Sequence, residues 1–355
     1  MAGIIFILGT MAWGINAASS PTENGQDSYR PLKKGLTLKE IAGSKLHHGR
    51  ARFLNPWIIP NSRSMFDIVI WKAFTTNDYK HLYKNDIITP VAIDWKPVMN
   101  HDGLSVTFIT HSTLLIKDSG INILVDPVLN GIMWPYIDYS PLSPETITSM
   151  PKPDYVLITH SHYDHLDIES LHQFKDTALF LTPLGFGKIM QDEGIQKHRE
   201  LDWLDDYSDG ARKFTLLPCN HWSHRNPMNA PNISLWGSYL IRTASGKVIY
   251  ISGDTAAFDR FDEIGGMADI DLAIFNVGAY EPRWFMKYAH MNPAETVKAF
   301  KELRAKQLMV VHWGTFRLGD EPVYLPPVDM KEEMARQGLS DRLIDIKHGQ
   351  TLYFP

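Results

Sequence analysis

Four side chains that can bind a metal ion lie within one short segment of the chain. His160, His162, Asp164 and His165 directly follow the apolar run 155–159. Imidazole nitrogen and carboxylate oxygen are ligands that zinc accepts when thiolates are absent. Residues two apart in an extended segment point the same way, so His160 and His162 can share one metal, and Asp164 and His165 can face a second. An unrelated polar loop is the alternative, but buried groups of this kind need partners.

One such motif cannot fill two coordination spheres, and three further residues qualify as ligands. Each of them follows an apolar run: His221, Asp254 and His312. A single histidine after a strand is more often structural. In open α/β sheets, however, functional groups gather beyond the carboxyl ends of strands, so these positions can converge. We therefore predict a site for two metal ions, with zinc favoured by the histidines and iron or manganese also compatible with the ligands.

Short apolar segments separated by turns must position these residues. Strands are expected at 104–109, 113–116, 122–125, 155–159, 178–181, 214–217, 234–241, 248–251, 272–276 and 307–311. Helices are expected at 185–193, 256–264, 293–305 and 329–337. Asn292 and Pro293 are a typical helix start, with asparagine as the N-cap and proline in the first turn. Strands alternating with helices predict a layered α/β domain.

The composition excludes several classes of protein. Hydrophobic residues make up 44% of the chain and charged residues 21%, which is typical of a globular protein. The net charge of -5 has no basic concentration, so a nucleic-acid partner is not expected. Cys219 is the single cysteine, which excludes an intramolecular disulfide and a cysteine-rich zinc site.

The N-terminus predicts export or membrane association. Residues 3–13 are almost all apolar, and small residues follow at 16–19, as in a secretory signal peptide. No Lys or Arg precedes the apolar run, so an uncleaved anchor and a buried strand remain alternatives. We therefore divide the chain into a signal peptide or anchor (1–18), an N-terminal arm (19–100) and a hydrolase domain (101–355). The arm contains an amphipathic stretch, 64–74, which is either a helix packed on the domain or a lipid-facing helix.

These motifs resemble those of a known superfamily. His160-x-His162-x-Asp164-His165, with the three downstream ligands, resembles the metallo-β-lactamase superfamily. Further motifs resemble the family of N-acylphosphatidylethanolamine-hydrolysing phospholipases D, over roughly residues 50–355: they lie at 53–57, 125–127, 221–222, 236–238, 252–255, 278–288, 290 and 312–316. Two departures are Thr110-His111-Ser112-Thr113, where the family usually has Gly-His-Ala-Thr, and Ala289 in place of a more polar residue.

The resemblance implies a fold, an activity and a division of ligands. The fold would be a four-layer αββα sandwich. His160, His162 and His221 would bind one zinc, Asp164, His165 and His312 the other, and Asp254 would bridge both. A hydroxide activated by the two ions would attack the phosphodiester of an N-acylated phospholipid at a membrane surface, and would release N-acylethanolamine and phosphatidic acid. A homodimer is also implied.

Other residues receive less direct predictions. Asp164, Asp254 and His290 are the predicted catalytic residues. Tyr280, Arg283 and His290 are expected to contact the phosphate or head group, although Arg283 also fits a structural role. Trp134, in the apolar loop 129–137, is expected at an acyl-chain rim, or the loop packs under the arm.

Two residues are expected to support the ligands. Asp126 is expected to accept a hydrogen bond from a ligating imidazole, or else to be a turn residue before Pro127. His111 is expected either behind the ligands, facing the substrate, or buried as a structural residue.

Two other functions are compatible with the same motifs. A metal-dependent lactonase, or another hydrolase of this fold, would have a small polar pocket beside the metals, with the 129–137 loop turned inward. A non-catalytic surface protein would use the zinc for structure, but structural zinc sites are closed by four protein ligands. Seven ligands shared by two ions leave positions open, which favours catalysis.

Overall fold

The computed structural model describes residues 35–57, 67, 70–226 and 228–354. The predicted signal peptide or anchor, 1–18, lies outside these residues. The predicted helix 64–74 lies partly outside them too, and its described end, Ile70–Phe74, is a π-helical turn, η1. Within the described ranges, no helix is both long and apolar enough to cross a membrane.

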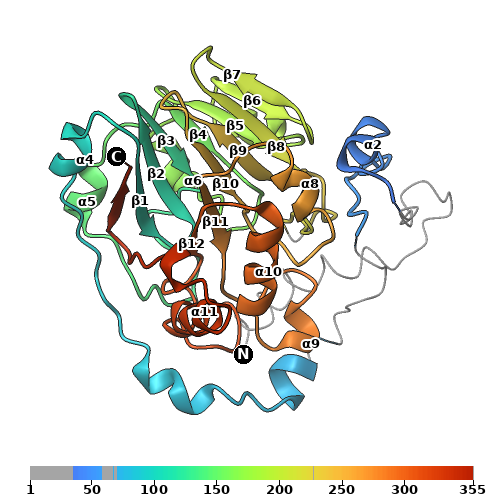
Figure 1. Cartoon of the computed structure of the whole chain (residues 1–355), viewed down its shortest axis with the longest axis vertical. Helices are drawn as coiled ribbons and strands as arrows, with labels where there is room; N and C mark the ends of the chain where they lie inside the picture. The colour runs from blue at the N-terminus through green and yellow to red at the C-terminus, as the bar shows by residue number, and fades with distance from the viewer. Residues whose placement is uncertain (1–34, 58–66, 68–69, 227, 355) are drawn as a thin grey trace.

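Two seven-stranded mixed sheets form the centre of the molecule (Figure 1). The first sheet has the order β14-β1-β2-β3-β4-β5-β6, with β1 Ser105–Thr110, β2 Thr113–Asp118, β3 Ile121–Val125, β4 Tyr155–Leu157, β5 Leu179–Pro183, β6 His198–Leu201 and β14 Thr351–Tyr353. The second has the order β13-β12-β11-β10-β9-β8-β7, with β7 Asp206–Ser208, β8 Lys213–Leu217, β9 Ser238–Arg242, β10 Val248–Ile251, β11 Leu272–Asn276, β12 Gln307–Val311 and β13 Leu343–Ile344.

Side chains that alternate along the strands build three apolar layers. Phe108 and Ile274 point between the two sheets and share one core cluster. Ile109, the next residue after Phe108, packs in a second cluster on the outer face of the first sheet. Phe275, the next residue after Ile274, packs in a third on the outer face of the second sheet. Because successive residues of a strand face opposite sides, both sheets are buried on both faces.

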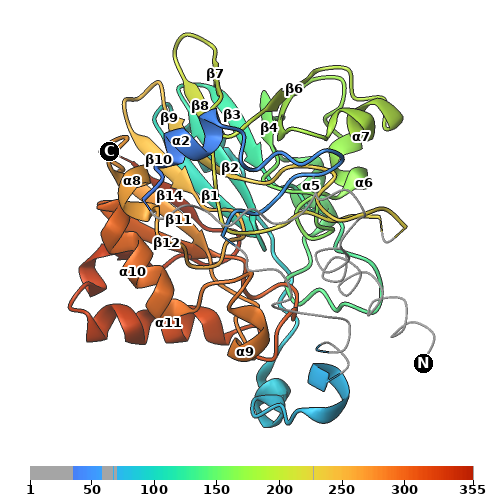
Figure 2. The ribbon, with the colours of Figure 1, turned by 90° about the vertical axis from the view of Figure 1, so that its right-hand side faces the viewer.

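Helices supply the two outer layers (Figures 1 and 2). The second sheet is covered by α8 Phe261–Gly265, α10 Pro293–Leu303 and α11 Leu325–Arg336. The first is covered by α4 Lys96–Asn100, α5 Pro144–Thr148, α6 Ile168–His172 and α7 Gly187–Asp192. The remaining short helices are α2 Leu38–Gly43, the 3-10 helices η2 Lys80–Asn85 and η3 Ser340–Arg342, and α9 Arg283–Met286. The predicted αββα sandwich is therefore confirmed.

The expected elements differ from the observed ones mainly at their ends. The Asn292 side chain accepts a bond from the Glu295 backbone in a capping box, so α10 begins at Pro293 as predicted. The predicted helix 256–264 begins only at Phe261. The predicted strand 234–241 begins only at Ser238, because the backbone N–H groups of Leu235 and Gly237 donate to Leu184 and Thr159 rather than to β8.

Candidate metal centre

The predicted ligands follow strands that run in the same direction within each sheet. In the first sheet β1, β3 and β4 share a direction, and His111 and His160 follow the ends of β1 and β4. In the second sheet β8, β10 and β12 share a direction, and His221, Asp254 and His312 follow their ends. The two sheets thus present these residues at one edge of the sandwich, and the side chains converge there into two groups.

The first group consists of His160, His162, His221 and Asp254. His160 Nε2 lies 2.8 Å from His162 Nδ1, and His221 Nε2 lies 3.3 Å from the same atom. Asp254 Oδ2 is 3.8 Å from His160 Nε2 and 3.7 Å from His221 Nε2. Three imidazole nitrogens and one carboxylate oxygen therefore face a common point.

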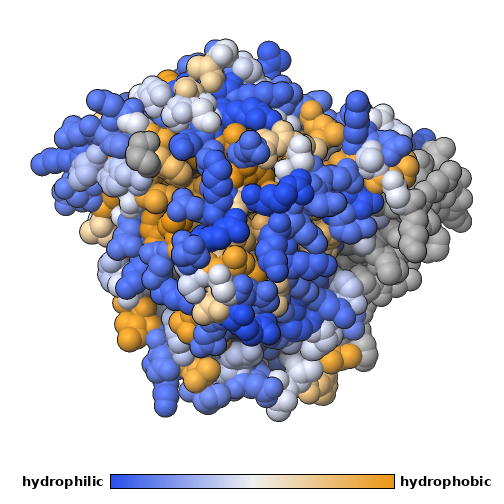
Figure 3. All heavy atoms as spheres, in the orientation of Figure 1, coloured by the Kyte–Doolittle hydropathy of each residue, from blue (hydrophilic) through white to orange (hydrophobic). Residues whose placement is uncertain are grey.

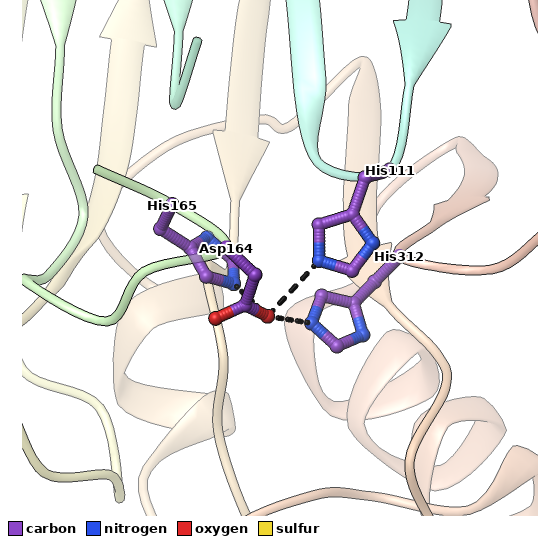
Figure 4. Close-up of side chains that lie close together, drawn as sticks. All are labelled: His111, Asp164, His165 and His312. Carbon is purple, nitrogen blue, oxygen red and sulfur yellow. Dashed lines mark hydrogen bonds and ion pairs between the residues drawn. The ribbon is translucent and has the colours of Figure 1, made fainter. Parts of the chain in front are cut away.

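The second group consists of His111, Asp164, His165 and His312 (Figure 4). Asp164 Oδ2 lies 3.0 Å from His111 Nε2, 3.4 Å from His312 Nε2 and 3.5 Å from His165 Nε2. The sequence left the role of His111 open, and the structure brings its ring into the same group as three predicted ligands. His111 can therefore either bind a metal or orient Asp164.

Asp254 lies between the two groups. Its Oδ1 is 3.3 Å from His312 Nε2 and its Oδ2 is 3.4 Å from His165 Nε2, both in the second group, while Oδ2 also faces the first group. Asn276, at the end of β11, donates to Oδ1 at 2.8 Å and so fixes the carboxylate plane. Asp254 is thus placed as a bridging carboxylate requires.

Hydrogen bonds behind the imidazoles orient them. Asp126 Oδ2 lies 2.8 Å from His165 Nδ1, as predicted for a supporting carboxylate, and Asp126 also accepts bonds from Thr159. The Ala289 carbonyl lies 3.1 Å from His221 Nδ1. Each of these oxygens can accept a hydrogen bond from Nδ1–H. The lone pair of Nε2 then stays free to bind a metal at the centre.

Most of the donor groups have the protonation state that a metal needs; at His165, burial is outweighed by Asp254 and Asp164, which raise the pKa of the imidazole well above its usual range. Burial lowers the pKa of His162 to about 3, and burial together with His165 lowers the pKa of His160 well below its usual range. Burial opposes ionisation of Asp254, but His312 and His165 outweigh it and hold the pKa of this carboxyl well below normal. Metals bind neutral imidazole and ionised carboxylate.

Two of the nitrogens that face the centre also lack any hydrogen-bond partner. Among the described residues, the buried Nε2 atoms of His165 and His312 have none. Buried polar atoms are normally satisfied, so an orphaned cluster of imidazole nitrogens is evidence for an ion. The two groups therefore fit metal ions.

The backbone is strained where it delivers these residues. His111, Asp126 and His312 have positive φ angles of 47°, 41° and 72°, which side chains other than glycine rarely adopt. Such conformations cost about 1–3 kcal/mol each and cluster at functional sites. Gly278 allows the close approach beside His312, since a Cβ there would lie 2.2 Å from the His312 carbonyl oxygen.

An open, largely apolar cavity leads to the two groups. His162, Asp164, His221 and Asp254 line its inner end, with His290 beside them. The wall is formed by side chains from several distant segments: Trp71, Ile132, Met133, Tyr136, Tyr163, Trp222, His224, Arg225, Ala279, Phe285, Met286, Ala289 and Leu318.

Three residues predicted to contact substrate do not line this cavity. Tyr280 is 2% exposed and donates its hydroxyl to Asp329 at 2.6 Å, so it is turned into the protein. Arg283 bonds to Glu295 at 2.7 Å and to the His290 carbonyl at 3.0 Å, which is the structural role. Trp134 is 76% exposed at the surface, while its neighbours Ile132, Met133 and Tyr136 reach the cavity.

Sequence reasoning missed other residues of the site. Trp71 forms part of the wall although it belongs to the N-terminal arm, and Arg225 supplies a cation to the wall. Asn55 donates to the His221 carbonyl and, at 3.0 Å, to Asn220. Asn55 lies inside the 53–57 motif that signalled the family, so that motif was the available clue; no local pattern marks Trp71 or Arg225.

Known proteins carry the same pattern of sequence. Residues 121–313 match the family model described as "Beta-lactamase superfamily domain". A relative from Caenorhabditis elegans, named N-acyl-phosphatidylethanolamine-hydrolyzing phospholipase D 1, is 30% identical, with 91% of this chain and 94% of the relative covered. The chain belongs to this phospholipase D family of the metallo-β-lactamase superfamily. A mitochondrial member from Saccharomyces cerevisiae is 34% identical, with 66% of this chain and 53% of the relative covered.

Solved structures of other proteins share the fold. A metallo hydrolase from the archaeon Ignicoccus hospitalis matches with a TM-score of 0.55 at 21% identity, over 71% of this chain and 99% of that one. A possible metal-dependent hydrolase from Veillonella parvula matches with a TM-score of 0.58 at 14% identity, over 71% and 99%. The family, the fold and the His/Asp groups together identify this member as a metal-dependent hydrolase.

Proposed function

We propose that this protein hydrolyses the phosphodiester bond of an N-acylated phospholipid at a two-zinc centre, releasing N-acylethanolamine and phosphatidic acid. The observation that carries the proposal is that the two His/Asp groups open directly into a cavity with an apolar wall. The named substrate of the worm and yeast relatives has the corresponding parts, a phosphodiester between acyl chains.

The roles of the chain's residues follow from the geometry. Two bound zinc ions would supply Lewis-acid charge and lower the pKa of a water molecule toward neutrality. Asp254 faces both groups and so holds the two ligand sets at a fixed spacing. Asp126 and the Ala289 carbonyl keep His165 and His221 in the tautomer that binds through Nε2. These bonds preorganise the centre before a substrate arrives.

His290 is the imidazole that we assign to the reacting phosphate. It lines the cavity, and its Nδ1 lies 3.9 Å from Asp254 Oδ2. A protonated His290 can give its proton to the ethanolamide oxygen as that oxygen leaves phosphorus. The ring lies in the cavity wall, within ligand distance of Asp254 and His312.

The character of the cavity favours a lipid over a lactone. A lactonase would need a small polar pocket, whereas the wall here includes Trp71, Met133 and Phe285. Part of the 129–137 loop does turn inward, but it contributes apolar side chains. An acyl chain gains free energy in such surroundings, at roughly 25 cal/mol per Å² of apolar surface buried.

The exposed residues near the cavity support a membrane as the partner. Phe74 is 77% exposed, Trp134 76% and Trp284 41%. Each lies within three residues of a side chain in the cavity wall, namely Trp71, Met133 and Phe285. Aromatic side chains favour the membrane–water interface. On the face seen in Figure 3, hydrophilic side chains are the majority and apolar side chains are scattered among them. We propose that the exposed aromatics face the lipid, so that substrate enters from the bilayer.

Hydrolysis of N-acylphosphatidylethanolamine in vesicles tests the proposed function. Protein stripped by a chelator and reloaded with zinc, iron or manganese should release N-acylethanolamine, with product masses identifying which bond breaks. In water enriched in ¹⁸O, the heavy oxygen should enter phosphatidic acid, because the nucleophile is water attacking phosphorus. Lactones and soluble phosphodiesters, assayed in parallel, test the other hydrolase functions.

The outcomes separate the alternatives. Turnover of lactones without turnover of the phospholipid would overturn the proposal, and so would heavy oxygen in the ethanolamide. Metal binding without hydrolysis of any of these substrates would favour the non-catalytic alternative. The homodimer, the export signal and the absence of a nucleic-acid partner stay predictions.

A further inference from the structure

One cationic side chain lies in the wall of the cavity. Among the described residues that line it, Arg225 is the only lysine or arginine. It follows His221 by four residues, in the segment that leads away from β8. Sequence reasoning had assigned the arginine contact to Arg283, which bonds to Glu295 instead. Arg225 therefore places a positive charge in the cavity wall, and the contacts of this charge determine its role.

The guanidinium of Arg225 is held in place by the segment that carries the predicted metal ligands. Its Nη1 donates to the carbonyl of Leu166, the residue after His165. Its carbon Cζ lies 4.5 Å from the centre of the Tyr163 ring, in a cation–π contact. Tyr163 lies within the ligand motif and Leu166 directly follows it, so the charge is fixed relative to the two His/Asp groups.

No carboxylate neutralises this charge within the part of the chain that the structure describes. Arg212, in contrast, pairs with Asp118 at 2.8 Å, and Arg317 pairs with Asp86 at 2.9 Å. Burial lowers the pKa of Arg225; Tyr163 and Asp167 oppose this shift, but Asp167 forms no ion pair with the guanidinium. Arg225 is half-buried, and a charge that has lost part of its water is normally paired, because leaving water is costly for an ion.

Arg225 therefore has the features of a residue that binds an anionic ligand. Its Nη1 is used by Leu166, while Nη2 and Nε make no bond to a described residue and can donate to two oxygens. An arginine suits a phosphate, whose oxygens match this pair of donors. Asp164 and Asp254, the carboxylates of the cavity, lie within the predicted ligand groups.

We propose that Arg225 recognises the phosphate oxyanion of the substrate in the cavity. The inference deepens the proposed function and rests on it, because it assigns the phosphodiester its protein contact. The charge of a phosphodiester is present before and during the reaction. Loss of Arg225 should therefore weaken substrate binding, and should slow turnover as well if the contact tightens in the transition state.

Calorimetry with a soluble probe tests the proposal without turnover. Dibutyl phosphate carries one negative charge, and tributyl phosphate is its neutral analogue. Arg225→Met should weaken dibutyl phosphate binding by roughly 10- to 100-fold, the range expected for charged hydrogen bonds, and Arg225→Lys by less. Binding of tributyl phosphate should change little. Added salt should weaken dibutyl phosphate binding in the natural protein more than in Arg225→Met.

Stability and metal content exclude a merely structural role. Arg225→Met should keep its metal content and should melt at the same or a higher temperature, because it removes an unpaired charge. Arg212→Met is the matched control: it breaks the Asp118 pair outside the cavity, so it should melt lower yet bind dibutyl phosphate normally when loaded with metal.

The results distinguish failure of this inference from failure of the proposed function. If Arg225→Met binds dibutyl phosphate as tightly as the natural protein, or binds weakly only because it loses metal, the inference is wrong. If the natural protein binds the probe through Arg225 but cleaves no N-acylated phospholipid, the proposed function fails while anion recognition stands. If the phospholipid is cleaved equally by both proteins, the inference alone fails.

Discussion

The two ends of the cavity are built in different ways. At the inner end, the ligand candidates follow parallel strands of two sheets, and His160, His165 and Asp254 are at most 3% exposed. At the outer end, the wall comes from loops and from the N-terminal arm, including Trp71 and Met133. Strand ends can hold reacting groups to a fraction of an ångström, whereas loops tolerate change. Mutations at the inner end should therefore change the chemistry, and mutations at the outer end should change the choice of substrate.

The largest effect is expected at the inner end of the cavity, from Asp254→Asn. Replacing the carboxylate that faces both groups by an amide removes the negative charge between them, so metal content and turnover should fall together, turnover by about 100-fold or more, beyond the usual effect of a supporting residue. Elemental analysis and the vesicle assay measure the two losses. Asp259→Asn, at a side chain 77% exposed, is the control and should change neither. A variant that kept both metals and most of its rate would contradict the bridging role.

The second-largest effect is expected where the N-terminal arm contacts the inner end of the cavity. Lys45, His47 and His48 all contact the Asp202 carboxylate, which fixes the arm on the domain. Asn55 then donates to the carbonyl of His221.

Asn55→Ala should therefore weaken metal binding in the His221 group by roughly 10-fold, the scale of a supporting hydrogen bond. Chelator competition should show one weakened site and one unchanged site. Asn85→Ala, which loses only a 3.3 Å bond to Tyr324, is the control. If Asn55→Ala and Asn85→Ala bind metal with equal affinity, the N-terminal arm contributes only to the outer end of the cavity.

Much of the inner end could be predicted because its signals are local in the sequence. An apolar run followed by a metal-capable residue marks His160, Asp254 and His312, and parallel strands bring such positions to one edge. The role of His111 could not be read in the same way. Its ring joins the ligand group through a turn with φ 47°, which no sequence pattern specifies.

The outer end could not be predicted because its contacts join distant segments. Tyr280 lies in the 278–288 motif that resembles the family, but its hydroxyl donates to Asp329, 49 residues later, so this residue of the motif serves packing rather than substrate contact. Trp71 bonds to Asp320 across 249 residues. Short strands such as β7 and β14 were missed for a related reason: they are partly exposed and lack an apolar run.

Trp71→Ala should alter substrate choice without altering the metals. The indole donates to Asp320 at 3.0 Å and packs 5.0 Å from the Phe285 ring, so its loss should widen the wall. The rate constant kcat/KM for long-chain substrate should fall roughly 3- to 10-fold relative to a short-chain analogue, the scale of one or two lost methylene contacts. Trp71→Phe should retain most of the preference. An equal fall for both chain lengths would remove Trp71 from acyl recognition.

The smallest effect is expected at the surface beyond the wall. Trp134 is 76% exposed and does not line the cavity, so Trp134→Ala should change the free energy of unfolding by at most about 0.5 kcal/mol. If this indole enters the bilayer interface, vesicle binding should weaken about two- to threefold, while turnover of a soluble phosphodiester stays constant. Met99→Ala, at an apolar residue of α4 that is 48% exposed, controls for general surface hydrophobicity. Cosedimentation with vesicles gives the binding constant. If both variants bind vesicles as tightly as the natural protein, Trp134 has no part in membrane contact. Met133 would then be the last residue before position 134 that contacts substrate, and Trp134 would be an ordinary surface residue.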